Sequence, residues 1–202
     1  MVTNDPTSRF LDYVCAGVHV DSQGRKGSLG RLARRSKSVV LPRRSRRRLM
    51  RVLGVDPGAV SGAYALVAVT SNGQAALAND IPVVDRQVDA AEWGRIVARL
   101  KPDVAVVEQV GSMPKQGVAS TFKFGMGCGL IRGVLMGAGV PIISVTPAKW
   151  KKHFSLNSDA EKSRALAIRR FPGVTTLARK KDHGRAEALL LALWKLETDD
   201  PV

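Results

Sequence analysis

The chain contains few cysteines and lacks a long hydrophobic run. Its two cysteines, Cys15 and Cys128, are far apart, which suits a reducing compartment and excludes a cysteine-based zinc site. The longest weakly polar stretch, residues 125–145, contains Arg132 and many glycines, so a buried helix and strand are expected there rather than a membrane span. The N-terminus is polar and no hydrophobic segment follows it, so no signal peptide is predicted. We therefore expect no membrane partner and a cytoplasmic location.

Acidic residues are also scarce, since 17 Asp and Glu stand against 32 Lys and Arg. The net charge is +15 and the pI about 10.6, so the expected partner is a polyanion. The hydrophobic content of 45% is enough for a sizeable core. A length of 202 residues fits one domain of about 150 residues with an appendage.

Residues 1–49 differ from the rest of the chain. The first fifty residues hold twelve Lys or Arg and three Asp, which is a net charge of +9. The segment includes the basic run PRRSRRR and is predicted to be a largely disordered N-terminal extension. A second interpretation stays open because Met50 directly precedes the first expected strand. Residues 1–49 could then be an upstream extension that the core, residues 50–202, does not need.

Residues 50–202 are predicted to form an α/β domain. Apolar runs and turn residues indicate strands at 51–56, 62–69, 74–83, 103–108 and 142–145. Helical spacing and capping residues indicate helices at 90–100, 117–139, 159–171 and 185–196, with another that starts at Pro147. Three antiparallel strands followed by alternating helices and parallel strands indicate a mixed five-stranded sheet flanked by helices.

Acidic side chains stand at the ends of these elements. Asp56 ends the first strand before a Pro-Gly turn, and taken alone it is better explained as an Asp that caps a hairpin. Other acidic or metal-binding positions are Glu108 at the end of DVAVVE, Asp182 and His183 before the last helix, and Glu187 in that helix's first turns. Two neighbouring strand ends and a helix start can bring these side chains to one point.

Carboxylates that lie a few ångströms apart repel one another strongly, and they persist when a divalent cation neutralises them. Ligation by oxygen with little or no sulfur favours Mg²⁺, with Mn²⁺ as the alternative. Two such ions about 3.5–4 Å apart promote in-line hydrolysis of a phosphodiester. The pattern therefore predicts a metal-dependent nuclease.

The chain resembles the Holliday-junction resolvase RuvC, and more closely the shorter RuvC-like resolvases of bacteriophages. The resemblance covers about residues 51–196 and rests on VLGVDPG with SGAYALV, VAVVEQV, TFKFG with IRGVL, VTPAKWKK and KKDHGRAEALLLAL, in this order. It implies an RNase H-like fold, a homodimer, and Mg²⁺-dependent symmetrical nicking of four-way junctions in DNA recombination and repair, in a bacterial or phage-infected cell. Asp56, Glu108 and Glu187 match the family's catalytic carboxylates.

The chain departs from the RuvC pattern just before its last carboxylate. RuvC proteins carry an acid or a histidine three residues before it, but here that position is Gly184. On a regular helix His183 shares a face with Glu187, whereas Asp182 would turn inward only if the helix began later. Either can be the fourth ligand. The alternative is structural, with Asp182 as an N-cap and His183 at the surface.

A second departure is Gly111, at a position where bacterial RuvC has an aromatic residue that stacks at the crossover. Met113, Phe122 or Phe124 could take this part, although the two phenylalanines are expected in the core. The glycines of residues 125–137 are expected to allow close helix packing, either across a dimer interface or inside the monomer.

Six lysines are candidate DNA contacts: Lys115, Lys123, Lys149, Lys151, Lys152 and Lys162. By resemblance, Lys151 and Lys162 match basic residues that face the scissile phosphates in RuvC. Each ammonium can neutralise a phosphate, so DNA binding should depend on salt. The alternative is a solvated basic helix face, which is usual for lone lysines.

Three functions remain in competition. The leading hypothesis is a structure-selective endodeoxyribonuclease that resolves four-way junctions. The second is an RNase H-like nuclease that acts on other branched DNA or on RNA–DNA hybrids. The third is a catalytically silent junction-binding protein on the same fold, and the joint presence of Asp56, Glu108 and Glu187 argues against it.

Overall fold

The computed structural model describes residues 50–58, 62–70, 73–111 and 117–199. The N-terminal extension, residues 1–49, lies outside this description, as do Met113 and Lys115. None of the helices in the described ranges has the length and apolar character that a membrane span requires.

A mixed five-stranded sheet forms the centre of the domain, in the order β3-β2-β1-β6-β7. Its strands are β1 (Met50–Asp56), β2 (Ala63–Thr70), β3 (Gly73–Asp80), β6 (Val104–Glu108) and β7 (Ile142–Val145). The first three pair antiparallel, whereas β1, β6 and β7 run parallel. The predicted sheet is confirmed. All five residues of β6 are buried, as expected of a central parallel strand.

The third strand ends at Asp80, three residues earlier than the sequence predicts. The backbone N–H of Ile81 still donates to the Gly62 carbonyl at 3.0 Å, but Pro82 has no N–H to continue the ladder. The chain instead forms a separate two-stranded hairpin, β4 (Val83–Val84) and β5 (Gln87–Val88), which the sequence analysis missed.

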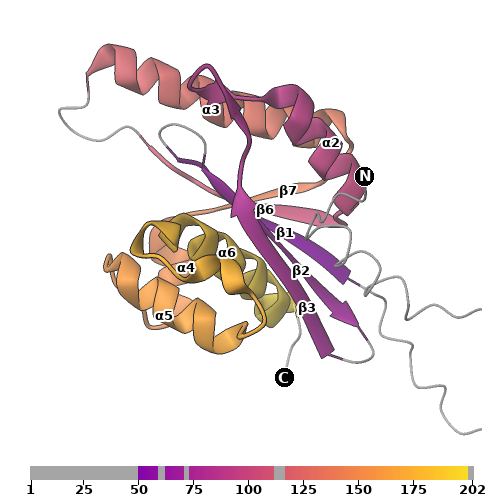
Figure 1. Cartoon of the computed structure of the whole chain (residues 1–202), viewed down its shortest axis with the longest axis vertical. Helices are drawn as coiled ribbons and strands as arrows, with labels where there is room; N and C mark the ends of the chain where they lie inside the picture. The colour runs from indigo at the N-terminus through magenta and orange to yellow at the C-terminus, as the bar shows by residue number, and fades with distance from the viewer. Residues whose placement is uncertain (1–49, 59–61, 71–72, 112–116, 200–202) are drawn as a thin grey trace, which may run out of the picture.

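Helices cover both faces of the sheet (Figure 1). One face carries α2 (Ala90–Leu100) and α3 (Val118–Gly137). The other carries α4 (Pro147–His153), α5 (Ala160–Arg170) and α6 (His183–Asp199), with the short turns η1 (Thr175–Leu177) and η2 (Lys180–Asp182) before α6. The bounds of α2 agree with the prediction, and Asp89 caps it by accepting a hydrogen bond from the Glu92 N–H at 2.9 Å. The last helix begins two residues earlier than predicted and ends three residues later.

α6 packs directly on the backbone of β1. A Cβ atom at Gly54 would lie 1.9 Å from the carbonyl oxygen of Ala188, so only glycine fits at this point of the strand. The contact determines where α6 begins relative to the end of β1. A Cβ atom at Gly184, in the first turn of α6, would lie 3.1 Å from Oδ2 of Asp56. The close approach of helix and strand therefore places the start of α6 beside Asp56.

Candidate active site

Asp56 and Glu108 end two neighbouring strands at one edge of the sheet. β1 and β6 are parallel with Val55 opposite Val107, so the next residue of each strand is one of these acids. Neighbouring strands lie about 4.8 Å apart. The turn after Asp56 requires Gly62, which has a φ of +87° and whose Cβ atom would lie 2.4 Å from the Asp56 carbonyl oxygen. The two acids come together because both apolar strands end at the same level.

Glu187 reaches the same place from the first turns of α6. Its side chain is buried, and its Oε1 lies 2.9 Å from Nζ of Lys151 in α4. The structure thus brings the three expected catalytic carboxylates together with one of the expected DNA-contacting lysines.

Trp150 holds Glu108 in one orientation. Its fully buried indole donates a hydrogen bond from Nε1 to Oε1 of Glu108, at 2.7 Å. In the sequence, Trp150 was noted only as part of VTPAKWKK, with no site role of its own. The available signal was its position on the helix that follows β7, because β7 pairs with the strand that ends in Glu108.

Burial and mutual repulsion raise the pKa values of two of these carboxyl groups. The pKa of Asp56 rises from 3.8 to about 8, first because burial disfavours the charge and then because Glu108 and Glu187 are negative. Burial also raises the pKa of Glu108; the Trp150 hydrogen bond opposes this rise and the charge of Glu187 adds to it. The positive charge of Lys151 lowers both pKa values. One lysine therefore does not compensate the negative charge that this site collects.

Asp182 is held by two arginines. Its carboxylate accepts hydrogen bonds from the backbone N–H and from Nη2 of Arg179, both at 2.8 Å, and lies 3.6 Å from Nη1 of Arg185. The Arg179 hydrogen bonds lower the pKa of Asp182 to about 2. The side chain of Asp182 therefore closes a capping box with Arg179, the N-cap of η2, rather than capping the last helix as the structural alternative expected. Its role as a metal ligand stays a prediction that would require it to leave Arg179.

His183, the other candidate for the fourth ligand, is exposed at the first residue of α6. Its Nδ1 lies 3.3 Å from the carbonyl oxygen of Lys180. Gly184 is the residue that borders Asp56 directly, and it has no side chain to offer. The choice between Asp182 and His183 thus stays open.

The carboxylate oxygens of Asp56, Glu108 and Glu187 suit a hard cation, although their side chains are not arranged around one. Within residues 50–58, 62–70, 73–111 and 117–199, no three His, Cys, Asp or Glu side chains are arranged to hold a metal ion. The ammonium of Lys151 contacts Glu187 instead. Three carboxylates, of which Asp56 and Glu108 have raised pKa values, with no thiolate among them, fit Mg²⁺ or Mn²⁺ in their chemistry.

No family model matches the chain, but individual proteins do. Two proteins named crossover junction endodeoxyribonuclease RuvC are similar over most of their lengths. That of Sorangium cellulosum is 28% identical over 155 residues, which are 73% of this chain and 84% of that protein. That of Syntrophomonas wolfei is 25% identical over 158 residues, which are 74% of this chain and 90% of that protein. A chloroplastic Holliday junction resolvase of Chlamydomonas reinhardtii is 36% identical over 93 residues, which are 45% of this chain and 10% of that protein.

Solved structures agree on the fold. The RuvC of Thermus thermophilus, in complex with a Holliday junction substrate, has a TM-score of 0.58 at 22% identity and covers 74% of this chain and 94% of its own. A fowlpox virus Holliday junction resolvase has a TM-score of 0.52 at 16% identity, and the match covers 75% of this chain and 100% of that protein. The chain is RuvC-like.

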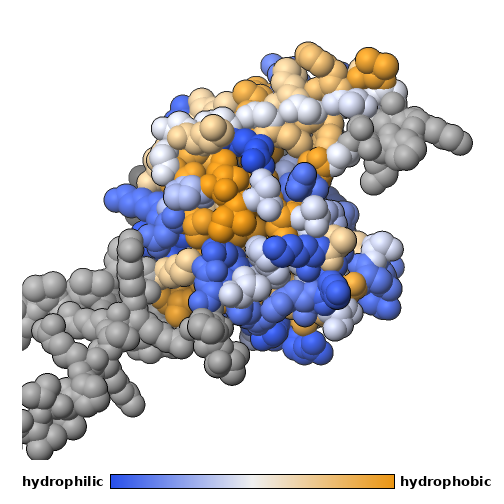
Figure 2. Space-filling view, turned by 180° about the vertical axis from the view of Figure 1, so that it is seen from behind, coloured by the Kyte–Doolittle hydropathy of each residue, from blue (hydrophilic) through white to orange (hydrophobic). Residues whose placement is uncertain are grey.

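The candidate DNA-contacting lysines of this RuvC-like domain have different surroundings. Lys151 contacts Glu187, whereas Lys152 and Lys162 are exposed, and Nζ of Lys149 lies 5.4 Å above the Trp194 ring. An open groove beside α4 is lined in part by Lys151 and Lys152. Figure 2 shows hydrophilic residues over the lower half of the molecule, where α4–α6 lie in Figure 1. Lys123 lies on α3 and lines a cavity together with Gly58, and Lys115 lies outside the described residues.

The RuvC-like domain leaves one face of α3 open. Val118, Phe122 and Met136 are 88%, 70% and 68% exposed. Cβ atoms at Gly125, Gly129, Gly133 and Gly137 would meet nothing within 4 Å. Two residues of α3, Ile131 and Leu135, are buried against the core. The α3 open face, defined here as Val118, Phe122, Met136 and these four glycines, is therefore separate from the surface that covers the sheet.

The expectation that Phe122 lies in the core is wrong, because its side chain belongs to this open face. Phe124 is partly buried. The N-terminal half of α3 extends past the sheet in Figure 1, so there is no sheet beneath it to bury a phenylalanine against.

Proposed function

We propose that this RuvC-like chain is a divalent-metal-dependent endodeoxyribonuclease that resolves four-way DNA junctions. The observation that carries the proposal is the convergence of Asp56, Glu108 and Glu187 beside Lys151. The two bacterial RuvC relatives, which match over most of their lengths, and the shared fold support the same activity.

Asp56, Glu108 and Glu187 would hold Mg²⁺, or Mn²⁺, at this edge of the sheet. A pair of such ions, when bound, would activate a water molecule and stabilise the leaving oxygen of the phosphodiester. Trp150 keeps Glu108 in position by its indole N–H. For the fourth ligand we favour His183, because its exposed ring has to give up one 3.3 Å contact, whereas Asp182 would lose its hydrogen bonds from Arg179.

The lysines supply the charge that brings the DNA backbone to this edge. Lys151 can exchange Glu187 for a non-bridging phosphate oxygen, while Lys149, Lys152 and Lys162 can contact phosphates farther along. Each phosphate contact releases counterions, so affinity should fall steeply with salt. Branched DNA is accordingly the proposed substrate.

A homodimer would present two such sites to the two strands of a junction. Two-fold symmetry places identical sites at a set separation, which symmetrical nicking requires. The proposed dimer contact is the α3 open face, where four glycines let a second backbone approach closely and Phe122 supplies apolar area.

A labelled synthetic four-way junction tests the activity. The wild-type protein with Mg²⁺ should give paired nicks at related positions, and EDTA should stop them. Asp56→Asn should lower the rate on the order of 10³-fold or more while junction binding is retained, because the substitution removes a charge from the metal site and leaves the lysines in place. Undiminished nicking by this variant would contradict the site assignment.

The same assay separates the competing functions. Faster cutting of a three-way junction or of an RNA–DNA hybrid than of the four-way junction would favour the second hypothesis. Tight junction binding by the wild-type protein with no cutting in either Mg²⁺ or Mn²⁺ would favour a silent binding protein.

A further inference from the structure

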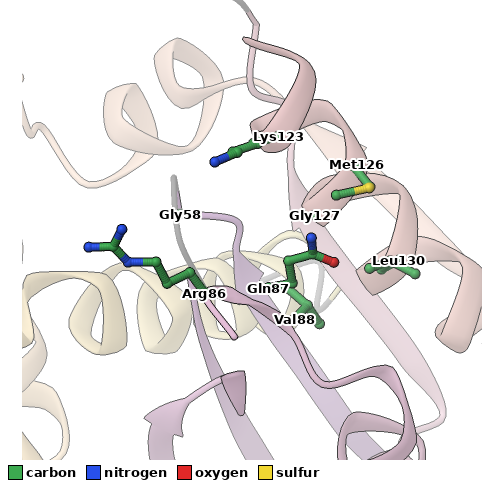
Figure 3. A pocket seen from close by; sticks show the side chains of 8 residues that line it. All are labelled: Gly58, Arg86, Gln87, Val88, Lys123, Met126, Gly127 and Leu130. Atoms are coloured by element: carbon green, nitrogen blue, oxygen red, sulfur yellow. The ribbon is translucent and has the colours of Figure 1, made fainter. Parts of the chain in front are cut away.

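A cavity of about 240 Å³ lies between the β4–β5 hairpin and α3 (Figure 3). It borders the active-site turn, because Gly58, two residues after Asp56, forms part of its wall. The cavity therefore lies next to the strand end that carries Asp56.

The cavity has a basic end and an apolar end. In Figure 3, Lys123 points from α3 toward the end beside Gly58, and the side chain of Arg86 extends outward past the same end. Val88, Met126 and Leu130 lie at the other end, and the carboxamide of Gln87 lies between the two ends. Val88 is buried, whereas Arg86, Gln87 and Lys123 are exposed. A ligand with a flat apolar part, a polar edge and a negative group would match this distribution.

The hairpin that carries Arg86 has an unfavourable turn sequence. Asp85 and Arg86 form the two-residue turn between β4 and β5, with φ values of 49° and 61°. Such turns strongly prefer Asn-Gly or Asp-Gly, because both positions are left-handed. An arginine at the second position costs backbone energy that a glycine would avoid. The strain is explained if the guanidinium is needed at this point.

We propose that this cavity binds one nucleotide next to the scissile phosphate. Its base lies among Val88, Met126 and Leu130, and its phosphate contacts Arg86 and Lys123. The Gln87 carboxamide, which can donate and accept, bonds to the base edge and gives the enzyme a base preference at that position. A base that enters this cavity has left the stack of the duplex, so the nucleotide is unpaired when bound. This inference rests on the proposed nuclease function.

Charge variants test the phosphate contacts without cutting. Junction affinity is measured by fluorescence anisotropy in EDTA over a series of salt concentrations. Arg86→Asn removes the charge and keeps a residue that tolerates the left-handed turn. Lys123→Gln removes the charge on α3. Each should weaken binding several-fold and lower the salt slope by roughly one. Lys101→Asn is the matched control, because Lys101 also has a left-handed backbone but precedes β6 at the opposite edge of the sheet from Glu108.

Base capture is tested with 2-aminopurine placed in turn at each position around the junction crossover. Its fluorescence should rise on wild-type binding at one position per strand, next to the nick, because the base leaves the stack. Gly127→Leu should abolish the rise, since a Cβ atom at Gly127 is already 3.8 Å from Cγ2 of Val88 and a larger side chain fills the cavity. Gln87→Ala, at an exposed position, should keep the rise but flatten the preference among junctions that differ only at that base.

The outcomes separate the two proposals. A wild-type protein that binds junctions without cutting them but shows the localised fluorescence rise would contradict the nuclease and support the cavity. Cutting with no rise at any position would overturn the cavity proposal, as would a rise that persists in folded Gly127→Leu. If Gly127→Leu has no cooperative thermal transition, Gln87→Ala decides, and an unchanged base preference in that variant overturns the assignment.

Discussion

The two longest helices of the described residues, α3 and α6, cover opposite faces of the sheet, and α6 buries far more of its surface than α3 does. α6 is buried without interruption from Ala186 to Trp194, between the sheet and α5. α3 is longer, yet two of its residues, Ile131 and Leu135, are buried. α3 is the more apolar of the two helices, yet it meets the core along a single edge, so its other faces leave apolar surface available to a partner.

This difference assigns separate tasks to the two faces of the sheet. On the α6 side, tight packing keeps Glu187 and its neighbours in fixed positions, as a site for charged reaction partners requires. On the α3 side, the open face and the β4–β5 cavity leave surface for DNA and for a second copy of the chain. The following predictions test that contrast, from the largest expected effect to the smallest.

Gly54→Ala should prevent stable folding. The added methyl group would lie 1.9 Å from the Ala188 carbonyl oxygen and would force α6 away from β1, at a cost of about 3 kcal/mol or more. Gly129→Ala on α3 is the matched control, because its Cβ atom meets nothing within 4 Å. It should stabilise the monomer by roughly 0.5–1 kcal/mol through helix propensity. Urea unfolding of both variants measures the contrast, and similar stabilities would contradict it.

Trp150→Phe should reduce junction cleavage about 10- to 100-fold with little loss of stability, because it removes the hydrogen bond that orients Glu108 and keeps the ring. Trp93→Phe provides the control on the α3 side. The Trp93 indole is also buried and donates to the Ile131 carbonyl oxygen at 3.3 Å, away from the carboxylates. Loss of this hydrogen bond in Trp93→Phe should leave the cleavage rate unchanged at a temperature where both variants are folded. Equal cleavage rates for the two variants would refute the positioning role of Trp150.

The metal-free protein should lose stability as pH rises from about 4 to 8. The folded pKa of Asp56, about 8, lies above its ordinary value of 3.8, so in this range the folded state binds more protons than the unfolded state. Asp56→Asn removes this proton uptake and should flatten the decline, giving a higher Tm than wild type at pH 8.5. Thermal unfolding in EDTA from pH 5 to 9 measures both curves. Parallel curves would show that Asp56 titrates normally.

The affinity for metal should depend on the protonation of Asp56 as well. Because Mg²⁺ must displace this proton, apparent affinity should rise by at most roughly tenfold per pH unit below about 8 and then level off. Calorimetry in buffers of different ionisation enthalpy counts the proton released. An affinity that does not change between pH 6 and 8 would contradict the raised pKa of Asp56.

Gly133→Arg should lower the dimer mass without unfolding the chain, since its position on the α3 open face is free within the monomer. Paired cuts on a junction should then fall more than single nicks. Gly133→Ala is the conservative control and should retain most of the dimer. Sedimentation that shows a wild-type monomer both on and off junction DNA would exclude the α3 open face as the contact.

Much of the fold could be predicted because its signals are local. Continuous apolar residues identified β6 as a buried parallel strand, and Asp89 and Pro102 marked the ends of α2. β3 was predicted to be too long, because its alternation continues past Asp80 and the prediction ignored Pro82. Acids that follow apolar strands also pointed to Asp56 and Glu108, since strand ends of a parallel pair meet at one edge.

The sequence by itself determined which elements form and which carboxylates stand at their ends, because apolar periodicity and capping act over a few residues. Only the tertiary structure decided what those carboxylates contact. The Trp150–Glu108 hydrogen bond joins residues 42 apart, and the Lys151–Glu187 ion pair depends on how α4 and α6 pack together. Asp182 was one of two candidates for the fourth ligand, yet in the fold its carboxylate is bound to Arg179. The Trp150–Glu108 and Lys151–Glu187 contacts follow from how the helices pack on the sheet, and the absence of a side chain at Gly54 allows the close approach of α6.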